Sequence, residues 1–207
     1  MYDCSEIKFL LPEEKEALFD AIEEDTSKYR IRNRSFFLLA EYAALRASEV
    51  GLIRVSDVNF NRKEIYFRRL KGSRNNTLRI MEESVWNALL DYMDFRNQHD
   101  IFSELLYPSQ KGNPISRKTL HKLMKKYCTV ANISKEKSHF HVLKHTRAVY
   151  LAELGLDTKE IQYWTGHKNI ANTEVYLQFT TTQQETLYRK IYTLQSVQDM
   201  FPKSEKK

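Results

Sequence analysis

The sequence predicts an α+β fold that is mostly helical, with a small antiparallel β-sheet of two or three strands near residues 55–81. The 207 residues include only 5 glycines and 4 prolines, which indicates long regular elements and few loops. Apolar residues recur at helical spacing on both sides of residues 55–81, whereas strand-like segments occur only within them. A chain of this length, with 42% hydrophobic residues, buries a sizeable core without disulfides.

Two long helices and one short helical turn are predicted before the sheet. Pro12 and the four charged residues that follow it open a helix that runs to about Asp25. The apolar segment from Ser35 to Leu45 predicts a second, largely buried helix. A short helical turn then begins at Ser48.

The predicted sheet rests on two short segments rich in β-branched and aromatic residues. Residues 64–68 and 77–81 are expected to be strands, and Asn75-Asn76 marks the turn before the second of them. Turn-forming residues surround Val58 and Phe60, which leaves room for a third strand.

Helices resume after the sheet. Ser116 is expected to cap one of them, while Gly155 and Gly166 each stand where a helix should end. The break at Gly166 is expected to leave His167 exposed. The predicted ranges are 82–97, 116–131, 142–154, 158–165 and 171–178.

The chain is predicted to be one domain with a C-terminal extension. Residues 1–180 contain no internal repeat and no clear linker. Residues 181–207 are expected to form a helix and tail, in which Leu187, Ile191 and Leu194 recur at helical intervals. This helix docks either on its own core or on a neighbouring subunit.

Cysteine usage and hydropathy indicate the compartment. Cys4 and Cys128 are too few for a disulfide framework, which favours a reducing compartment. The N-terminus is acidic where a signal peptide needs a basic and then an apolar segment. The longest apolar stretch, Phe36–Leu45, is interrupted by Glu41 and is half the roughly 20 residues that a membrane span needs. We therefore expect a cytoplasmic protein without a membrane partner.

The charges are segregated along the chain. The net charge is +6, but residues 62–79 hold seven basic residues and one acid, and residues 111–126 hold six basic residues and no acid. Such basic segments are what contact with nucleic-acid phosphates requires. The alternative, which charge alone leaves open, is a pair of solvated faces.

Four separated segments carry candidate functional residues. Arg46 ends an apolar helix, and Glu49, three residues on, either pairs with it or orients it toward a phosphate. Lys71 lies in the turn between two strands, where it can reach a DNA groove or be a plain surface lysine. Gly166-His167 is followed, after eight residues, by Tyr176, one of 12 tyrosines.

The remaining segment is His141-Val142-Leu143-Lys144-His145, in which residues 141, 144 and 145 share a helical face. His141 and His145 have the spacing of a zinc-binding pair. The metalloprotease motif would have Glu where Val142 stands, and no carboxylate or cysteine ligand follows nearby. Metal binding is therefore disfavoured.

Together the four segments resemble the tyrosine recombinase (phage integrase-like) family, in which Arg, Lys, His-x-x-Arg, His or Trp, and Tyr occur in this order. The resemblance covers roughly residues 10–180, and some phrases are similar to the short recombinases that invert fimbrial promoter switches. It implies a helical catalytic domain that cleaves and rejoins DNA through a 3′-phosphotyrosyl intermediate, with neither a nucleotide nor a metal cofactor. The implied catalytic residues are Arg46, Lys71, His141, Lys144, His167 and Tyr176.

The resemblance also implies a role for each residue. Tyr176 would be the nucleophile and Lys71 would protonate the departing 5′-oxygen. His141 would assist proton transfer to and from the tyrosine. The phosphate oxygens would be held by Arg46, Lys144 and His167.

Lys144 departs from the family pattern, which usually has arginine at this place. Arginine grips two phosphate oxygens with its planar fork, whereas lysine offers a point charge. Three explanations are open: lysine suffices at a reduced rate, the chain is an engineered or degenerate variant, or Arg147 reaches the site from one turn away.

The expected partner is double-stranded DNA, bound by a homotetramer that is a monomer or weak oligomer when free. The chain is expected to lack the N-terminal core-binding domain that many members carry, as a natural minimal form or an excised fragment. Two alternative functions remain: a type IB topoisomerase-like enzyme that nicks and reseals one strand, and a DNA-binding relative whose cleavage is impaired.

Overall fold

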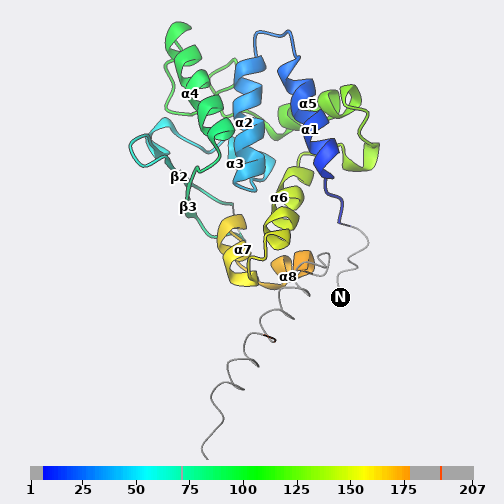
Figure 1. Cartoon of the computed structure of the whole chain (residues 1–207). Helices are drawn as coiled ribbons and strands as arrows, with labels where there is room; N and C mark the ends of the chain where they lie inside the picture. The colour runs from blue at the N-terminus through cyan, green and yellow to red at the C-terminus, as the bar shows by residue number, and fades with distance from the viewer. Residues whose placement is uncertain (1–6, 71, 178–191, 193–207) are drawn as a thin grey trace, which may run out of the picture.

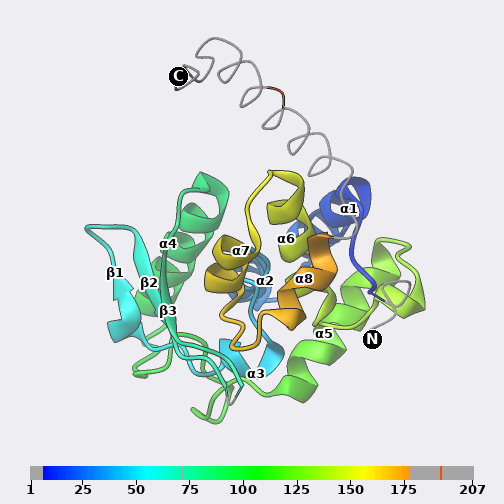
Figure 2. The ribbon, with the colours of Figure 1, turned by 90° about the horizontal axis from the view of Figure 1, so that it is seen from below.

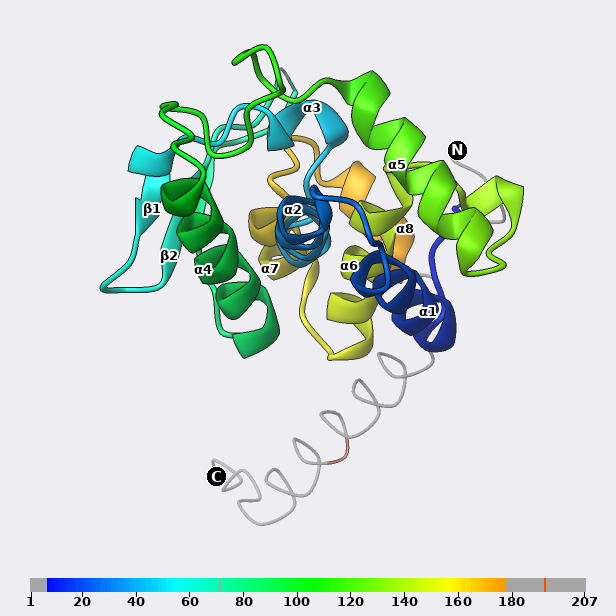
Figure 3. The same cartoon turned by 90° about the horizontal axis from the view of Figure 1, so that it is seen from above.

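The helix α2 (Arg30–Tyr42) lies at the centre of the fold in the computed structural model, which describes residues 7–70, 72–177 and 192 (Figure 3). Its neighbours are α1 (Pro12–Glu23), α4 (Glu83–Gln98) and α6 (Val142–Glu153). Phe36, Phe37 and Leu39 of α2 are fully buried, as expected for a helix that is covered on several sides.

The buried helix was predicted to run from Ser35 to Leu45, and the structure corrects both ends. The helix begins at Arg30, five residues before the predicted start. The prediction missed its first turn because that turn is mostly polar and lacks the apolar spacing that marks a buried segment. The helix ends at Tyr42 because Ala44 takes a left-handed conformation with φ of 50°. The Leu45 N–H then donates to the Ala40 carbonyl at 2.9 Å, which closes the helix end.

A three-stranded antiparallel sheet stands beside α4, in the order β1 (Val58–Asn59), β2 (Glu64–Phe67) and β3 (Asn76–Arg79) (Figure 2). Ile65 of β2 pairs with Leu78 of β3, and both side chains are buried against the core. The alternation of buried and exposed residues fixes this register, since a shift by one residue would expose the apolar face. The predicted fold class is confirmed.

The other helices begin and end close to their predicted bounds. Ser116 caps α5 (Arg117–Val130) by accepting the Thr119 N–H at 3.0 Å. Asp157 caps α7 (Thr158–Thr165), and Gly166 ends that helix with φ of 67°. The remaining helices are α3 (Ala47–Val50) and α8 (Ala171–Leu177), with short 3₁₀ turns at Val55–Asp57 and Lys135–Lys137.

The helices α6, α7 and α8 form one end of the molecule (Figure 1). A small apolar cluster of Ala148, Leu151, Ala152 and Ile161 joins them, and the ring of Tyr176 belongs to it. In the part of the chain that the structure describes, no helix is long and apolar enough to cross a membrane. Lys71 and, apart from Tyr192, the predicted C-terminal helix in residues 181–207 lie outside the described residues.

Candidate active site

Five of the six predicted site residues come together where α3, α6, α7 and α8 meet (Figure 2). Burial raises the pKa of Tyr176 and the nearby Arg46 charge opposes that rise, while both Arg46 and Lys144 act on the pKa of His167. His141, at the start of α6, is in turn affected by Lys144 and Arg46. The sixth residue, Lys71, is outside the described residues, but its neighbours Leu70 and Gly72 lie in the β2–β3 connection.

Arg46 is held by Glu49, as its spacing suggested. Arg46 Nη1 lies 3.1 Å from Glu49 Oε1, and the Arg46 backbone N–H donates to Glu49 Oε2 at 2.9 Å. Arg46 also donates to the Ser73 hydroxyl in the β2–β3 connection. Its side chain stays 30% exposed, whereas that of Glu49 is fully buried. The arrangement therefore fits both interpretations: Glu49 pairs with Arg46 and also orients a guanidinium that remains accessible.

Arg69 is a second guanidinium on Glu49, and it was not among the predicted site residues. The sequence places it only within a basic segment, yet its side chain is fully buried. An arginine has five N–H donors, and all five of those of Arg69 are used inside the protein. The acceptors are Asn76 Oδ1, Glu49 Oε2 and the carbonyls of Ala43, Ala44 and Trp164.

These bonds connect the end of α2, the end of α7 and the sheet. Burial alone would raise the pKa of the Glu49 carboxyl, but the Arg69 and Arg46 charges hold it below its usual value. Glu49 is thus ionised between two cations. With no free donor, Arg69 positions Arg46 through Glu49 and does not itself reach for a phosphate.

The turn at Gly166 places His167 inside the site, and the expectation that His167 is exposed was wrong. Only 4% of His167 is exposed. The turn packs against the β2–β3 connection, because the Arg74 N–H donates to the Gly166 carbonyl at 2.8 Å and Ser73 forms a β-bridge with His167. His167 Nδ1 lies 3.0 Å from the Thr173 hydroxyl of α8. A sequence pattern identifies the break but not the segment that covers it.

Lys144 lies in the centre of the cluster and is 1% exposed. Its Nζ donates to the Thr165 carbonyl at 2.7 Å, in the last turn of α7. Burial and the neighbouring Arg69 charge lower the pKa of this ammonium well below its ordinary value. An ammonium has three donors, so the bond to Thr165 leaves others that can point at a bound anion.

Tyr176 is the predicted nucleophile, and its hydroxyl lies 2.8 Å from Nδ1 of His145. The expected partner of the tyrosine was His141, whose ring instead meets that of His145 edge-on, with the ring centres 4.5 Å apart. The ring of His167 is stacked on that of Tyr176. Tyr176 is only 2% exposed, and burial raises the pKa of its phenol.

The comparisons with known proteins agree with this geometry. The sequence model described as the phage integrase family matches residues 8–183. The type 1 fimbriae regulatory protein FimB of Escherichia coli K12 is 34% identical over 175 residues, which are 84% of this chain and 86% of FimB. This chain belongs to the phage integrase family.

Other proteins similar to this chain are named as recombinases. The tyrosine recombinase XerC of Listeria welshimeri is 27% identical over 191 residues, and the match spans 88% of this chain but only 61% of XerC. The site-specific recombinase XerH, solved as a post-cleavage complex on its difH substrate, superposes with a TM-score of 0.76 at 22% identity. That match covers 88% of this chain and 53% of XerH. The comparisons confirm the predicted family and enzyme class.

Arg147 does not reach the candidate active site. The explanation that Arg147 substitutes there for the family's usual arginine, in place of Lys144, was therefore wrong. The Arg147 guanidinium pairs with Glu82 at 2.6 Å and lies over the rings of Tyr42 and Trp164, within 5.1 Å of each ring centre. Arg147 follows His145 by two positions on α6, which turns its side chain by about 200° away from the face that meets Tyr176. Arg147 therefore belongs to the packing between α2, α6 and α7.

The two basic segments of the sequence are distributed differently in space. In residues 62–79, Lys63 and Arg68 pair with Glu83 and Asp57, and Arg69 is buried. Acids from elsewhere in the chain therefore neutralise three of the seven basic residues of that segment. In residues 111–126, helix α5 divides the charges between two faces.

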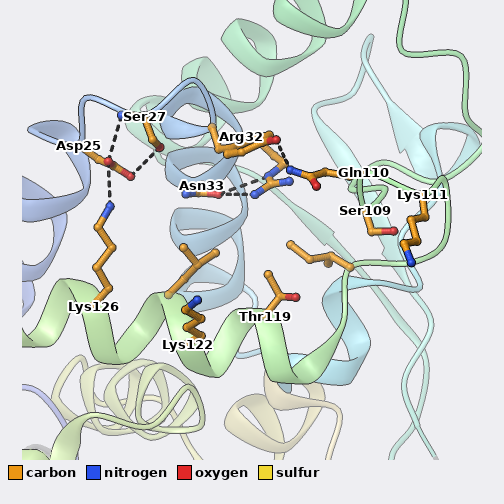
Figure 4. A pocket seen from close by; sticks show the side chains of 13 residues that line it. Asp25, Ser27, Arg32, Asn33, Ser109, Gln110, Lys111, Thr119, Lys122 and Lys126 are labelled. Carbon is orange, nitrogen blue, oxygen red and sulfur yellow. Dashed lines mark hydrogen bonds and ion pairs between the residues drawn. The ribbon is translucent and has the colours of Figure 1, made fainter.

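One face of α5 lines a groove of about 630 Å³ between α2 and the Ser109–Lys111 loop (Figure 4). Lys122 and Lys126 project into it, and Asp25 neutralises Lys126 at 2.9 Å. No predicted site residue lines this groove. The other face carries Arg117, whose positive charge helps to lower the pKa of His141. Arg117 therefore adds positive charge at the edge of the candidate active site.

Among the described residues there is no group of three or more His, Cys, Asp or Glu side chains that could hold a metal ion. His141 and His145 face one another in the site without a carboxylate or thiol beside them. Of this pair, His145 contacts the Tyr176 hydroxyl.

Proposed function

We propose that this chain is a site-specific tyrosine recombinase that cleaves and rejoins double-stranded DNA through Tyr176. The observation that carries the proposal is the meeting of the Tyr176 phenol with the His145 imidazole, in a site that also holds the cationic side chains of Arg46 and Lys144. A phosphodiester resists attack because its negative charge repels nucleophiles and grows in the transition state. Positive donors held in advance around the phosphate lower that barrier.

In the proposed cleavage step, Tyr176 Oη bonds to phosphorus while the bond from phosphorus to the 5′-oxygen breaks. Arg46, Lys144 and His167 stabilise the non-bridging oxygens. Lys71 protonates the departing 5′-oxygen. The resulting 3′-phosphotyrosyl bond conserves the energy of the phosphodiester for rejoining. Because Tyr176 is only 2% exposed, its side chain has to become accessible when DNA binds.

The test is formation of a covalent adduct on a nicked DNA site, from which the cleaved 5′ end diffuses away. The wild-type protein should accumulate adduct, whereas Tyr176→Phe should bind the same DNA and form none. Tyr150→Phe changes a 40% exposed tyrosine of α6 and serves as the matched control. Absence of wild-type adduct on DNA sites recovered by selection from random sequence would refute the proposal.

Lys144 favours a second candidate, a DNA-binding relative with impaired cleavage. Its ammonium is buried and already engaged with Thr165, where the family usually places an arginine. This candidate predicts DNA binding without adduct, and gain of adduct in Lys144→Arg. A type IB topoisomerase-like activity would instead appear as relaxation of supercoiled plasmids that lack the selected site.

We further propose that four copies act on two paired DNA sites, in the cytoplasm where the nucleoid lies. The XerH recombinase was solved on a palindromic substrate, and the α5 face with Arg117 provides positive charge next to the site.

Residues 181–207 are proposed to dock on a neighbouring copy. Removing them should preserve binding to one site but abolish strand exchange, measured by gel shift and by product formation. Full exchange by the shortened chain would exclude that docking role.

A further inference from the structure

His145 is the residue hydrogen-bonded to the nucleophile of the proposed reaction. Its Nδ1 lies 2.8 Å from the Tyr176 hydroxyl, which is an ordinary hydrogen-bond distance for an O–H donor. The two residues come from different helices, α6 and α8, whose packing in the small apolar cluster fixes their separation. A phenol held this way can pass its proton directly to the imidazole.

We propose that His145 is a catalytic residue, the base that takes the phenolic proton of Tyr176 during DNA cleavage. This inference rests on the proposed recombinase function and refines it. The resemblance to the family had implied His141 for that task, and His145 had no implied role. The assignment comes from the contact between His145 and the reacting oxygen.

The two other histidines of the site have different surroundings. His141 lies at the first turn of α6, near Arg46 and Lys144, which places it with the groups that face a phosphate. The ring of His167 lies parallel to the Tyr176 ring with the ring centres 6.3 Å apart, and its Nδ1 meets Thr173 instead of the phenol. His145 is thus the histidine whose ring nitrogen is directed at Tyr176 Oη.

The site keeps His145 neutral, with a lone pair free for a proton, but its surroundings in the absence of DNA weaken it as a base. Burial lowers its pKa to about 3, and the neighbouring His141, His139 and Lys144 act in the same direction. The imidazole is therefore neutral, and in the tautomer that carries its proton on Nε2 the Nδ1 lone pair accepts the O–H of Tyr176. A phosphodiester anion between Arg46 and Lys144 would offset these cations and raise the basicity of His145. Proton transfer becomes easier when the scissile phosphate is in place.

Bonds and protons balance in both directions of the reaction. The Tyr176 proton moves to His145 Nδ1 as the bond from Oη to phosphorus forms, and the 5′-oxygen leaves with a proton from Lys71. In rejoining, a 5′-hydroxyl attacks the phosphotyrosine, Lys71 recovers a proton, and the imidazolium of His145 returns its proton to the leaving phenolate. No oxidant, metal or further co-reactant enters either direction.

The test separates proton transfer from mere placement of the tyrosine. Asparagine presents an oxygen acceptor close to the position of imidazole Nδ1 but is not a base, so His145→Asn keeps the hydrogen bond and removes the proton acceptor. We expect His145→Asn to slow adduct formation by about 100-fold, in the range typical of general-base catalysis. DNA affinity should not change.

The decisive comparison uses a more acidic phenol. Site-specific 3,5-difluorotyrosine at position 176 loses its proton without strong assistance, so the deficit of His145→Asn should shrink by tenfold or more relative to the natural phenol. An unchanged deficit would reduce His145 to a positioning residue and overturn the proposal. A deficit below threefold with natural tyrosine would also overturn it.

Two variants serve as controls. His99→Asn replaces a histidine that stacks on Phe95 at the end of α4, and it should form adduct at the wild-type rate. His141→Asn should slow adduct formation by the same factor for both phenols, because it acts on the phosphate side. If the fluorinated phenol rescues His141→Asn and not His145→Asn, the base is His141. Failure of the wild-type protein to form adduct refutes the recombinase function itself and is distinguishable from all of these results.

Discussion

Glu49 lies with its two carboxylate oxygens against two guanidinium groups and has no exposed surface. Its Oε1 meets Arg46 at 3.1 Å and its Oε2 meets Arg69 at 3.3 Å. One of these arginines is accessible and the other is fully buried with saturated donors. A single carboxylate therefore both neutralises a core cation and orients Arg46, the accessible cation of the proposed site.

Glu49→Gln keeps the shape of this side chain and removes its charge. Because Arg69 is then buried without a counter-ion, we expect the free energy of unfolding to fall by about 3–5 kcal/mol. Urea denaturation at neutral pH measures the loss. Glu64→Gln, which removes a partly exposed partner of Arg62 at 3.9 Å, should change stability by less than about 1 kcal/mol. Equal effects of the two variants would contradict the role assigned to Glu49.

Arg147 allows a test of the division between packing and catalysis on α6. Arg147→Met removes the contacts with Glu82, Tyr42 and Trp164, and we expect a stability loss of about 2 kcal/mol. Adduct formation by the folded protein, measured well below the unfolding temperature, should stay within twofold of wild type. A large loss of adduct would return Arg147 to the catalytic site.

At the scale of elements, the end of α7 is fitted against the β2–β3 connection. Gly166 has φ of 67°, and a β-carbon added there would lie 2.8 Å from the Arg74 carbonyl and 3.0 Å from Arg69 Nε. Both the left-handed conformation and the lack of space require glycine. The same contact holds His167 beside the connection that carries Lys71 in the sequence.

Gly166→Ala is expected to destabilise the protein by more than about 2 kcal/mol, since backbone strain and a steric clash add together. Adduct formation should fall as well, because His167 and the β2–β3 connection are pushed apart. Gly112→Ala is the matched control, with φ of 77° and no atom within 4 Å of the added carbon. It should lose only the strain contribution of about 1 kcal/mol and keep full activity. Thermal unfolding and the adduct assay check both variants.

At the scale of the whole molecule, the packing of α6 against α8 buries the imidazoles of His141 and His145 close to the Lys144 ammonium. Burial and nearby Lys144 or His charges lower the pKa of His141 to about 4 and that of His145 to about 3, from an ordinary value near 6.5. Above pH 6.5 neither the folded nor the unfolded chain protonates them. Between pH 6.5 and about 4 the unfolded chain binds these protons and the folded chain does not, so stability falls as the pH falls.

The double variant His141→Asn with His145→Asn removes this linkage. We expect its free energy of unfolding to decline less than that of wild type between pH 6.5 and 4, measured by urea denaturation at closely spaced pH values. Carboxylates titrate in both proteins and cancel in the comparison. Parallel pH profiles would show that the two histidines are already solvated in the folded chain.

Much of the fold follows from local sequence. Helix ends were predicted where a side chain caps them, as at Ser116, or where glycine permits a left-handed residue, as at Gly155 and Gly166. The start of α2 was not predicted, because its first turn is mostly polar and apolar residues do not recur there at helical spacing. Burial of that helix is a property of its neighbours.

The order and spacing of Arg46, the Lys144 segment, His167 and Tyr176 determined the family and singled out Tyr176 as the proposed nucleophile, because the chemistry needs these residue types and the chain carries them in a fixed order. The tertiary structure alone decided that His167 is buried, that Arg69 shares Glu49 with Arg46, and that His145 meets the phenol. The contacts of Arg69 with Glu49 and of His145 with Tyr176 join residues 20 or more positions apart. Local spacing places residues on a helix face, but which distant segment meets that face is set by how the helices pack.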